Sequence, residues 1–388
     1  MYKVTKGIIL AGGKGKRMWP ITQPKPLIPY AGGTMLGNLV RKMRAAGIED
    51  IVVVGSGEGG IEKEARRLGA KHIVQKKCGS GGALWSARNE VDGSFLAIAV
   101  DTYCEARDIK GVVKSGGGWV VSVKEADAGE RYGKVVVKEG RVARIDEKEK
   151  GKGLVNTSIY VFDPGVFELL EKAKEQNNGE VYITDVVKGS RIYMMKGEWI
   201  DMGYPWDVLK ANELELSGMK TKVKGRVSGT KVKGNVVVEE GAIVEGSFIY
   251  GNAYIGKGCV VGPNSMLNGA VCLMDGVEIG FGTIVKNSII MQGTKAKHLS
   301  YIGDSVVGRD VNFGGGSMIA NLRFDRNEVK CPSNGRFVGT GRVKFGAVVG
   351  DRVQIGVNAS IMPGTLVEEG AFIGPGCVAK GKVEAAYP

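Results

Sequence analysis

The 388-residue chain has only two histidines, and its six cysteines show no paired spacing. The cysteines are scattered along the chain at Cys78, Cys104, Cys259, Cys272, Cys331 and Cys377. Without CxxC pairs or a Cys–His spacing, neither a zinc site nor a disulfide framework is indicated. We therefore expect reduced thiols and a cytoplasmic protein.

Long apolar runs are also missing. No stretch approaches the roughly 18–20 residues that a membrane-spanning helix needs. The N-terminal sequence MYKVTKGIIL runs directly into a strand-like pattern and contains no signal-peptide core or cleavage site. We expect no membrane partner.

Acidic residues are absent from 217–235, SGMKTKVKGRVSGTKVKGN, which contains six Lys or Arg. This segment supplies much of the net charge of +13. Because no basic face is interleaved with aromatic residues, the charge does not favour nucleic-acid binding. A positive potential also suits phosphorylated small molecules, which we expect as the partners.

Residues 1–216 alternate short β-rich runs, such as GIILAG and FLAIAVD, with helical spacing, as in TMLGNLVRKMRAAG. This alternation predicts an α/β domain, Rossmann-like, with a mostly parallel sheet. We interpret the basic segment 217–235 as a linker to a second domain, 236–388.

From residue 237 onward, apolar residues recur at every sixth position. The first train has ten members: Val237, Ile243, Ile249, Ile255, Val261, Leu267, Leu273, Ile279, Val285 and Met291. A second train contains Tyr301, Val307, Phe313 and Ile319, and then Phe337, Val343, Val349, Ile355, Ile361, Val367 and Ile373. A six-residue period predicts a hexapeptide β-solenoid, in which each hexad places one apolar residue inside.

The train is disturbed twice. The step from Met291 to Tyr301 is ten residues, so KAKHLS, 295–300, would add four residues and contains His298. Residues 321–336 lack apolar residues at the expected places. We predict two excursions from a rigid coil, where chemistry is often located.

The N-terminal half opens with LAGGKGKRMWPITQPKP, a glycine-rich loop followed by basic residues. Glycines allow the backbone to approach phosphates, and cationic side chains neutralise phosphate oxygens. The combination G-G-x-G-x-R with a later P-K-P resembles the sugar-1-phosphate nucleotidylyltransferase family across essentially the whole first half.

The resemblance implies roles for particular residues. Asp101 and Asp201 would hold Mg²⁺, and Arg17 and Lys25 would be catalytic. The substrate-binding positions implied are Gly12, Gly13, Gly15, Gly79, Ser80, Gly133, Glu147, Lys148 and Asn156. In the implied reaction, a sugar-1-phosphate oxygen attacks the α-phosphorus of a nucleoside triphosphate, and pyrophosphate leaves. Positioning and charge neutralisation would do most of the catalytic work.

The segment KAKHLSYIGDSVVGRDVNFGGGSMIAN, 295–321, resembles the acetyltransferase domain of bifunctional N-acetylglucosamine-1-phosphate uridyltransferases and their archaeal two-domain homologues. The resemblance makes His298 the catalytic base and puts Gly315 at the acetyl-CoA thioester. The substrate-contacting positions implied are Lys286, Tyr301, Asn312, Asn321 and Lys330. A histidine side chain ordinarily titrates near neutral pH, so it can take a proton from an attacking amine.

The sequence thus predicts a nucleotidylyltransferase domain followed by a left-handed parallel β-helix. The predicted substrates are glucosamine-1-phosphate (or galactosamine-1-phosphate), acetyl-CoA, and UTP or dTTP. The resemblance implies a homotrimer or a dimer of trimers. Two alternatives remain. One is a glucose-1-phosphate or mannose-1-phosphate nucleotidylyltransferase on a structural β-helix, and the other is a non-catalytic subunit that binds sugar nucleotides.

Overall fold

A computed structural model describes residues 4–57, 59–76, 78–127, 131–146, 149, 151–176, 180–333 and 335–385, with the backbone alone at 174–176. The chain divides into two compact units. The first, the α/β unit, comprises 1–14, 24–28 and 34–201, and the second, the solenoid unit, comprises 15–23, 29–33 and 202–388. No helix in the described part of the chain is long and apolar enough to cross a membrane.

A nine-stranded mixed sheet forms the centre of the α/β unit, in the order β5-β4-β1-β6-β11-β8-β12-β10-β9. The strands are β1 (Lys6–Ala11), β4 (Asp50–Gly55), β5 (Lys71–Val74), β6 (Phe95–Ala99), β8 (Val120–Asp127), β9 (Lys134–Lys138), β10 (Arg141–Asp146), β11 (Lys152–Phe162) and β12 (Arg191–Met194). β4, β1 and β6 run parallel, and their buried apolar runs produce the β-rich stretches seen in the sequence. The parallel part of the α/β prediction is confirmed at these strands.

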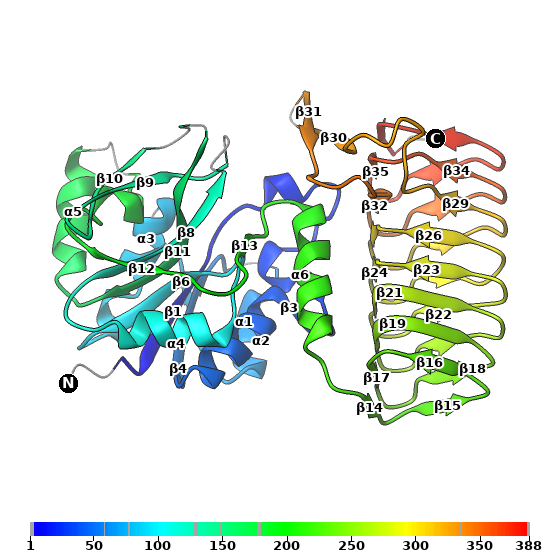
Figure 1. Cartoon of the computed structure of the whole chain (residues 1–388), viewed down its shortest axis with the longest axis horizontal. Coiled ribbons are helices and arrows are strands. Elements are labelled where there is room, and N and C mark those ends of the chain that lie inside the picture. The colour runs from blue at the N-terminus through cyan, green and yellow to red at the C-terminus, as the bar shows by residue number, and fades with distance from the viewer. Residues whose placement is uncertain are drawn as a thin grey trace. The chain divides into compact units, whose positions relative to one another are not determined.

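Helices cover both faces of this sheet, as Figure 1 shows. Buried side chains of α1 (Met35–Ala45), α2 (Ile61–Arg67) and α4 (Ala106–Lys114) belong to one apolar cluster, and those of α3 (Gly79–Ser86) and α5 (Val166–Gln176) to another. Short elements complete the unit: β3 (Gly33–Thr34), β7 (Thr102–Tyr103), β13 (Ile200–Asp201), and the 3-10 turns η2 (Lys25–Leu27), η3 (Arg88–Glu90) and η4 (Ile183–Asp185). The arrangement is a three-layer α/β/α domain.

The solenoid unit is a stack of parallel coils (Figure 1) with α6 (Pro205–Ser217), η1 (Lys16–Met18) and β2 (Pro29–Tyr30). Face A contains β15 (Arg226–Ser228), β18 (Ile243–Glu245), β20 (Val260–Val261), β22 (Glu278–Ile279), β25 (Lys295–Ala296), β28 (Asn312–Phe313), β33 (Gln354–Ile355) and β36 (Phe372–Ile373).

Face B contains β16 (Lys231–Lys233), the first halves of β19 (Phe248–Ile255) and β21 (Met266–Leu273), then β23 (Ile284–Lys286), β26 (Tyr301–Gly303), β29 (Met318–Ile319), β34 (Ser360–Ile361) and β37 (Val378–Ala379). Face C contains β14 (Lys222–Val223), β17 (Val236–Val238), the second halves of β19 and β21, then β24 (Ile289–Ile290), β27 (Val306–Val307), β32 (Ala347–Val349), β35 (Thr365–Val367) and β38 (Lys382–Val383). The predicted parallel β-helix is confirmed.

The coil register corrects the first predicted excursion. Val285 pairs with Ile302, and Ile302 pairs with Ile319. Each of these steps is 17 residues, so the segment 295–300 does not add the four residues that we predicted. Ile302 is the fully buried interior residue, and Tyr301 faces outward. The apolar train was misread because Tyr301 and Ile302 are adjacent. KAKHLS is strand β25 followed by an ordinary turn, 297–300, that leads from face A to face B.

The second excursion is real. Val307 pairs with Val349, 42 residues later, and the added chain forms a hairpin of β30 (Lys330–Ser333) and β31 (Arg336–Gly339). Phe337 and Val343, which the train placed in the interior, are 69% and 50% exposed there. The two were misassigned because they keep the six-residue spacing only by coincidence while the chain is outside the coils.

The basic segment 217–235 differs from the linker that we expected. Its strands β14, β15 and β16 pair in parallel with β17, β18 and β19 and form the first coil of the solenoid. Lysines there flank Val223 and Val232, which pair with the buried Val238 and Ile249 and so face inward, and this alternation is the period of strands. The compact units divide between Asp201 and Met202, so α6 groups with the solenoid unit, whereas we predicted it at the end of the first domain.

Two candidate active sites

The glycine-rich loop follows β1 at the carboxyl end of the parallel strands. At Gly12 a Cβ atom would lie 1.6 Å from Oε1 of Gln75, whereas at the exposed Gly13 it would meet nothing within 4 Å. Gly15 adopts a left-handed backbone (φ 60°) at the start of η1. Gly12 thus makes room for the Gln75 side chain, and the bare backbone at Gly13 leaves open space where a phosphate can approach.

A carboxylate pair lies in the same unit. Lys25 is buried and forms an ion pair with Asp101, which follows β6 and the buried Val100. Asp201 on β13 pairs in antiparallel register with Thr102 of β7, so it lies across from the residue next to Asp101. The structure therefore brings the two predicted metal ligands together.

The donor set fits Mg²⁺. Both carboxylates are partly exposed, and Mg²⁺ prefers one or two carboxylates supplemented by waters and substrate phosphates. Among the described residues, no group of three or more His, Cys, Asp or Glu forms a closed metal site. Arg131, which the sequence did not single out, donates to the backbone carbonyl of Asp201 at 3.3 Å.

Arg17 belongs to the solenoid unit. It is exposed, and its guanidinium lies 5.3 Å from the centroid of the Tyr204 ring, immediately before α6. Cation–π contact at this separation holds the side chain while leaving its N–H donors available.

Gly133 and Asn156 are brought together, because the Asn156 N–H donates to the Gly133 carbonyl at 3.1 Å. The Asn156 side chain donates to the Tyr160 hydroxyl at 2.7 Å. Gly79 and Ser80 open α3, where the Ser80 hydroxyl accepts from the Ile183 N–H at 3.0 Å. Glu147 and Lys148 lie outside the described residues.

In the solenoid, His298 lies on the edge between faces A and B and is exposed. Gly315 occupies the same edge one coil later, where a Cβ atom would lie 3.5 Å from the His298 Cβ. The His298 carbonyl accepts from Gly316 N–H at 3.2 Å, whereas no hydrogen bond from the Gly315 N–H is found among the described residues. Gly315, whose N–H has no partner in that part of the chain, thus lies next to the exposed His298 in the neighbouring coil.

A second group converges on Gly303. An added Cβ there would lie 2.8 Å from both the Tyr301 hydroxyl and Asn321 Nδ2, and Lys286 pairs with Gly303 from the coil below. Burial and the nearby Asp304 charge raise the pKa of Tyr301, against a hydrogen bond from Asn321 that lowers it. Three of the predicted substrate-contacting side chains thus share one patch of face B.

Two predicted residues lie elsewhere. Asn312 is on face A, paired with Lys295, and is exposed. Lys330 begins the hairpin and is exposed, paired with Gly339. No side-chain hydrogen bond ties either of them to His298 or Tyr301 in the described structure.

Asp304 and Arg342 were missed by the sequence analysis. Asp304 is buried with a left-handed backbone (φ 47°), and its carboxylate accepts from Asn321 Nδ2 at 2.5 Å. Arg342 lies 3.7 Å from that carboxylate and also binds Glu213 of α6. The spacing of Asn287, Asp304 and Asn321, each 17 residues apart, was the available signal.

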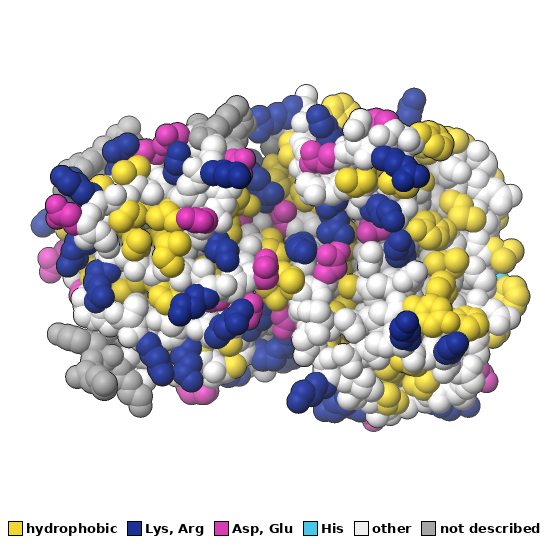
Figure 2. All heavy atoms as spheres, in the orientation of Figure 1, with side chains coloured by type: hydrophobic (Ala, Val, Ile, Leu, Met, Phe, Trp, Pro, Cys, Tyr) yellow, Lys and Arg dark blue, Asp and Glu magenta, His cyan; other side chains and the backbone are white. Residues whose placement is uncertain are grey.

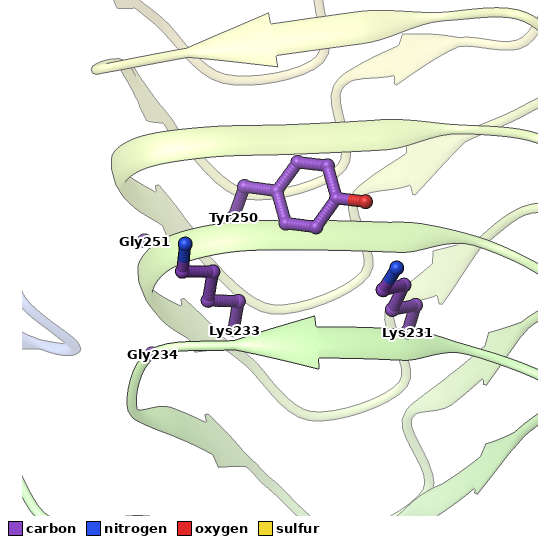
Figure 3. A pocket seen from close by; sticks show the side chains of 5 residues that line it. All are labelled: Lys231, Lys233, Gly234, Tyr250 and Gly251. Atoms are coloured by element: carbon purple, nitrogen blue, oxygen red, sulfur yellow. The ribbon is translucent and has the colours of Figure 1, made fainter.

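The first coil bears a basic depression of about 640 Å³. Figure 3 shows Lys231 and Lys233 of β16 directed toward the neighbouring strand, with the Tyr250 ring above them. Elsewhere, the view in Figure 2 shows Lys and Arg interspersed with Asp and Glu rather than gathered in one stripe. This depression contains none of the predicted site residues.

Comparisons with known proteins agree with this two-domain plan. A family model described as nucleotidyl transferase matches residues 6–218. A model described as GMPPB C-terminal domain matches 243–338, and one described as bacterial transferase hexapeptide (six repeats) matches 346–381.

Full-length relatives are similar over both units. A bifunctional protein GlmU of Methanocaldococcus jannaschii is 37% identical, covering 97% of this chain and 95% of its own. A bifunctional sugar-1-phosphate nucleotidylyltransferase/acetyltransferase of Sulfurisphaera tokodaii is 34% identical, covering 96% of each. The chain therefore belongs to the nucleotidyl transferase family, in its bifunctional branch with a hexapeptide-repeat domain, as the sequence resemblance implied.

Proposed function

We propose that the solenoid unit acetylates the amine of glucosamine-1-phosphate or galactosamine-1-phosphate with acetyl-CoA. The observation that carries this proposal is the placement of His298 beside the Gly315 N–H, which has no partner among the described residues, in adjacent coils of a rigid stack. An exposed base next to an oxyanion donor suits acyl transfer to an amine.

In the proposed step, the amine nitrogen attacks the thioester carbonyl and forms the N–C bond. His298 takes the proton from the amine, the Gly315 N–H donates to the developing oxyanion, and the C–S bond breaks to release CoA. Lys286 would neutralise the sugar phosphate, and Tyr301 and Asn321 would orient the sugar. Asn312 and Lys330 remain proposed contacts of bound substrate.

We infer that the α/β unit transfers UMP or dTMP from UTP or dTTP to the sugar-1-phosphate and releases pyrophosphate. Gly12, Gly13 and Gly15 would approach the phosphates, and Lys25 and Arg17 would neutralise the departing pyrophosphate. Gly79 and Ser80 would face the nucleotide, and Gly133, Asn156, Glu147 and Lys148 the sugar. Asp101 and Asp201 would hold Mg²⁺, which when bound neutralises phosphate charge.

Self-association is also proposed. On face B, aligned outward positions carry an apolar ladder, in which Phe248, Met318 and Val378 are 42%, 43% and 66% exposed. Met266, Ile284 and Tyr301 continue the same ladder, and the polar Ser360 lies in it between Met318 and Val378. A flat, exposed apolar stripe suits burial against another copy, and we propose a homotrimer or a dimer of trimers, acting in the cytoplasm.

A single-activity nucleotidylyltransferase on a structural solenoid is the second candidate. The match of 243–338 to a domain named for GMPPB favours it. The two candidates differ in whether CoA is released, since both predict pyrophosphate release. A non-catalytic subunit would release neither product.

The deciding experiment measures CoA release from acetyl-CoA and glucosamine-1-phosphate, and pyrophosphate release from UTP or dTTP with N-acetylglucosamine-1-phosphate. We compare wild type, His298→Ala and Lys25→Ala. We expect His298→Ala to lose CoA release alone and Lys25→Ala to lose pyrophosphate release alone. A wild-type chain that releases pyrophosphate but no CoA would establish the second candidate.

A further inference from the structure

Three side chains occupy one corner of successive coils and form a hydrogen-bonded ladder. Asn287 Oδ1 accepts from the Ala270 N–H at 2.9 Å, and Asn287 Nδ2 donates to Asp304 Oδ1 at 3.3 Å. Asp304 Oδ2 accepts from Asn321 Nδ2 at 2.5 Å. The ladder ends at Asn321, next to Tyr301.

The ladder has a direction that its chemistry fixes. The backbone N–H of Ala270 can only donate, so Asn287 must turn its oxygen toward Ala270 and its NH₂ toward Asp304. A carboxylate can only accept, so Asp304 receives a hydrogen bond from both neighbours. Asn321 must therefore turn its NH₂ toward Asp304.

The consequence lies at the remaining amide atom. Nδ2 of Asn321 donates to Asp304, and the same NH₂ group also donates to the Tyr301 oxygen. Oδ1 is left as an acceptor, and no partner for it is found in the described part of the chain. An amide at position 304 would act differently, because it would direct a donor toward Asn321 and turn that amide over. In a ladder made only of amides, the side chain at 304 would donate to Asn321. Because 304 is a carboxylate, Asn321 is the donor instead, and its oxygen is turned away from 304.

We propose that Asp304 is a positioning residue of the acetyl-transfer site, holding Asn321 so that its Oδ1 accepts a hydrogen bond from the amine of the sugar. The inference rests on the proposed acetyltransferase function. Asp304 itself is buried behind Asn321 and does not contact substrate. It acts only through the orientation of the Asn321 amide.

A cationic side chain also lies beside the Asp304 carboxylate. Arg342 comes within 3.7 Å of Asp304 Oδ1 and is itself bound to Glu213. The left-handed backbone at Asp304, where a glycine or asparagine is commoner, is tolerated because the side chain is held on three sides. Arg342 belongs to the excursion, so the excursion helps to fix the ladder.

The test is a set of three variants: Asp304→Asn, Asn321→Asp, and the double variant. Asp304→Asn turns the Asn321 amide over, so that its NH₂ group, a donor, faces the amine of the sugar, which is also a donor. We therefore expect the KM for glucosamine-1-phosphate to rise about 10- to 100-fold. The KM for acetyl-CoA should change less than about twofold. In the double variant, the amide introduced at position 304 donates to the carboxylate introduced at position 321, whose second oxygen again accepts. We expect it to recover at least about tenfold in kcat/KM over Asp304→Asn.

Asp351→Asn is the matched control. Asp351 is equally buried in the solenoid, and its carboxylate accepts from Arg309 N–H at 2.7 Å and Arg309 Nε at 2.8 Å. We expect its KM values to match wild type. Pyrophosphate release with N-acetylglucosamine-1-phosphate and the melting temperature report whether each variant is folded.

The outcomes separate the two proposals. Two results would overturn the positioning role of Asp304 while leaving the proposed acetyltransferase function intact. One is a wild-type KM in Asp304→Asn, and the other is a double variant with no higher kcat/KM than Asp304→Asn. An equal rise of KM in Asp351→Asn would show that losing any buried carboxylate of the solenoid has this effect, and it would likewise overturn the positioning role of Asp304. A wild-type chain that releases no CoA overturns the proposed function, and the ladder's role with it.

Discussion

At the scale of single residues, Gly303 makes room for the side chains around it. The Tyr301 ring and the Asn321 amide occupy the space that a Cβ at 303 would take, each within 3 Å. The clashing atoms are the ends of side chains, and the Gly303 backbone is not left-handed. A methyl group there would therefore displace the site without breaking the coil.

We predict that Gly303→Ala folds but lowers kcat/KM for acetyl transfer about 10- to 100-fold, since misplacements near 1 Å reduce rates by this order. CoA release is the measurement. Gly93→Ala is the control, because a Cβ at Gly93 meets nothing within 4 Å. Unchanged CoA release by Gly303→Ala would contradict the placement of Tyr301 and Asn321 at the substrate.

The cysteines offer a second prediction at this scale. Cys78 and Cys377 are exposed, whereas burial raises the pKa of Cys259 to about 11 and of Cys272 and Cys331 to about 12. Since only the thiolate reacts, we expect iodoacetamide at about pH 8 to alkylate the two exposed cysteines and spare the buried ones. Peptide mass spectrometry reads the result, with the denatured chain as control. Native alkylation of Cys272 would show that its coil opens.

At the scale of elements, ion pairs link neighbouring coils of face A. Glu278 on β22 lies 3.1 Å from Lys295 of β25 and 2.6 Å from Lys297. Hydrogen bonding from Lys297 and then Lys295 lowers the pKa of Glu278. The two lysines thus bind β22 to the turn that carries His298.

This gives a pH-dependent prediction. Because the folded pKa of Glu278 lies below the unfolded value of about 4.3, its stabilisation is present above that pH and is lost as pH falls through the folded pKa. We expect Glu278→Gln to lower the melting temperature by about 1–3 °C at about pH 7, and this deficit to shrink as the pH falls from about 7 toward 3. Melting curves recorded across this range test this. An equal deficit at both ends would mean that packing, not charge, is lost.

The elements also show what sequence periodicity can and cannot give. The six-residue period predicted the solenoid because each hexad places one residue inside, as with Val285 and Ile319. It misplaced Tyr301 because a 17-residue coil is one residue short of three hexads, which moves the interior position to Ile302. The basic first coil was missed because its inward valines have no coil beneath them, and Val223 remains 49% exposed.

At the scale of the whole molecule, the apolar ladder of face B leads to a prediction of assembly. We expect the chain of 41.2 kDa to behave in solution as a trimer or a hexamer. Met318→Glu should weaken the assembly, because it puts charge into the middle of the ladder. Light scattering after size-exclusion chromatography measures the mass. Val260→Glu is the control, because Val260 is 41% exposed on face A and lies outside this ladder. A monomeric wild type would refute the proposal.

In both candidate sites, residues within one continuous segment could be singled out from the sequence, whereas contacts between distant segments could not. His298, Gly315, Tyr301 and Asn321 could be predicted because the resemblance falls on one continuous segment. The role of Arg342 could not, because it returns to Asp304 from an excursion whose course no periodicity predicts. In the α/β unit, Asp101 and Asp201 are far apart in sequence and become neighbours only through the pairing of β7 with β13.

In this part of the stack, the number of residues in each coil determines which side chains of neighbouring coils lie next to one another. His298 meets Gly315, and Asn287, Asp304 and Asn321 align, only because 17 residues separate each from the next. Deleting a single residue between 305 and 314 would shorten two of these spacings at once, His298 to Gly315 and Asp304 to Asn321. Within the stack only a turn can absorb a change of length, as between Leu267 and Val285, which pair across 18 residues. The chain between Ile319 and Ala347 has already left the coils, so the hairpin of β30 and β31 is the place in this protein to insert a tag or a reporter.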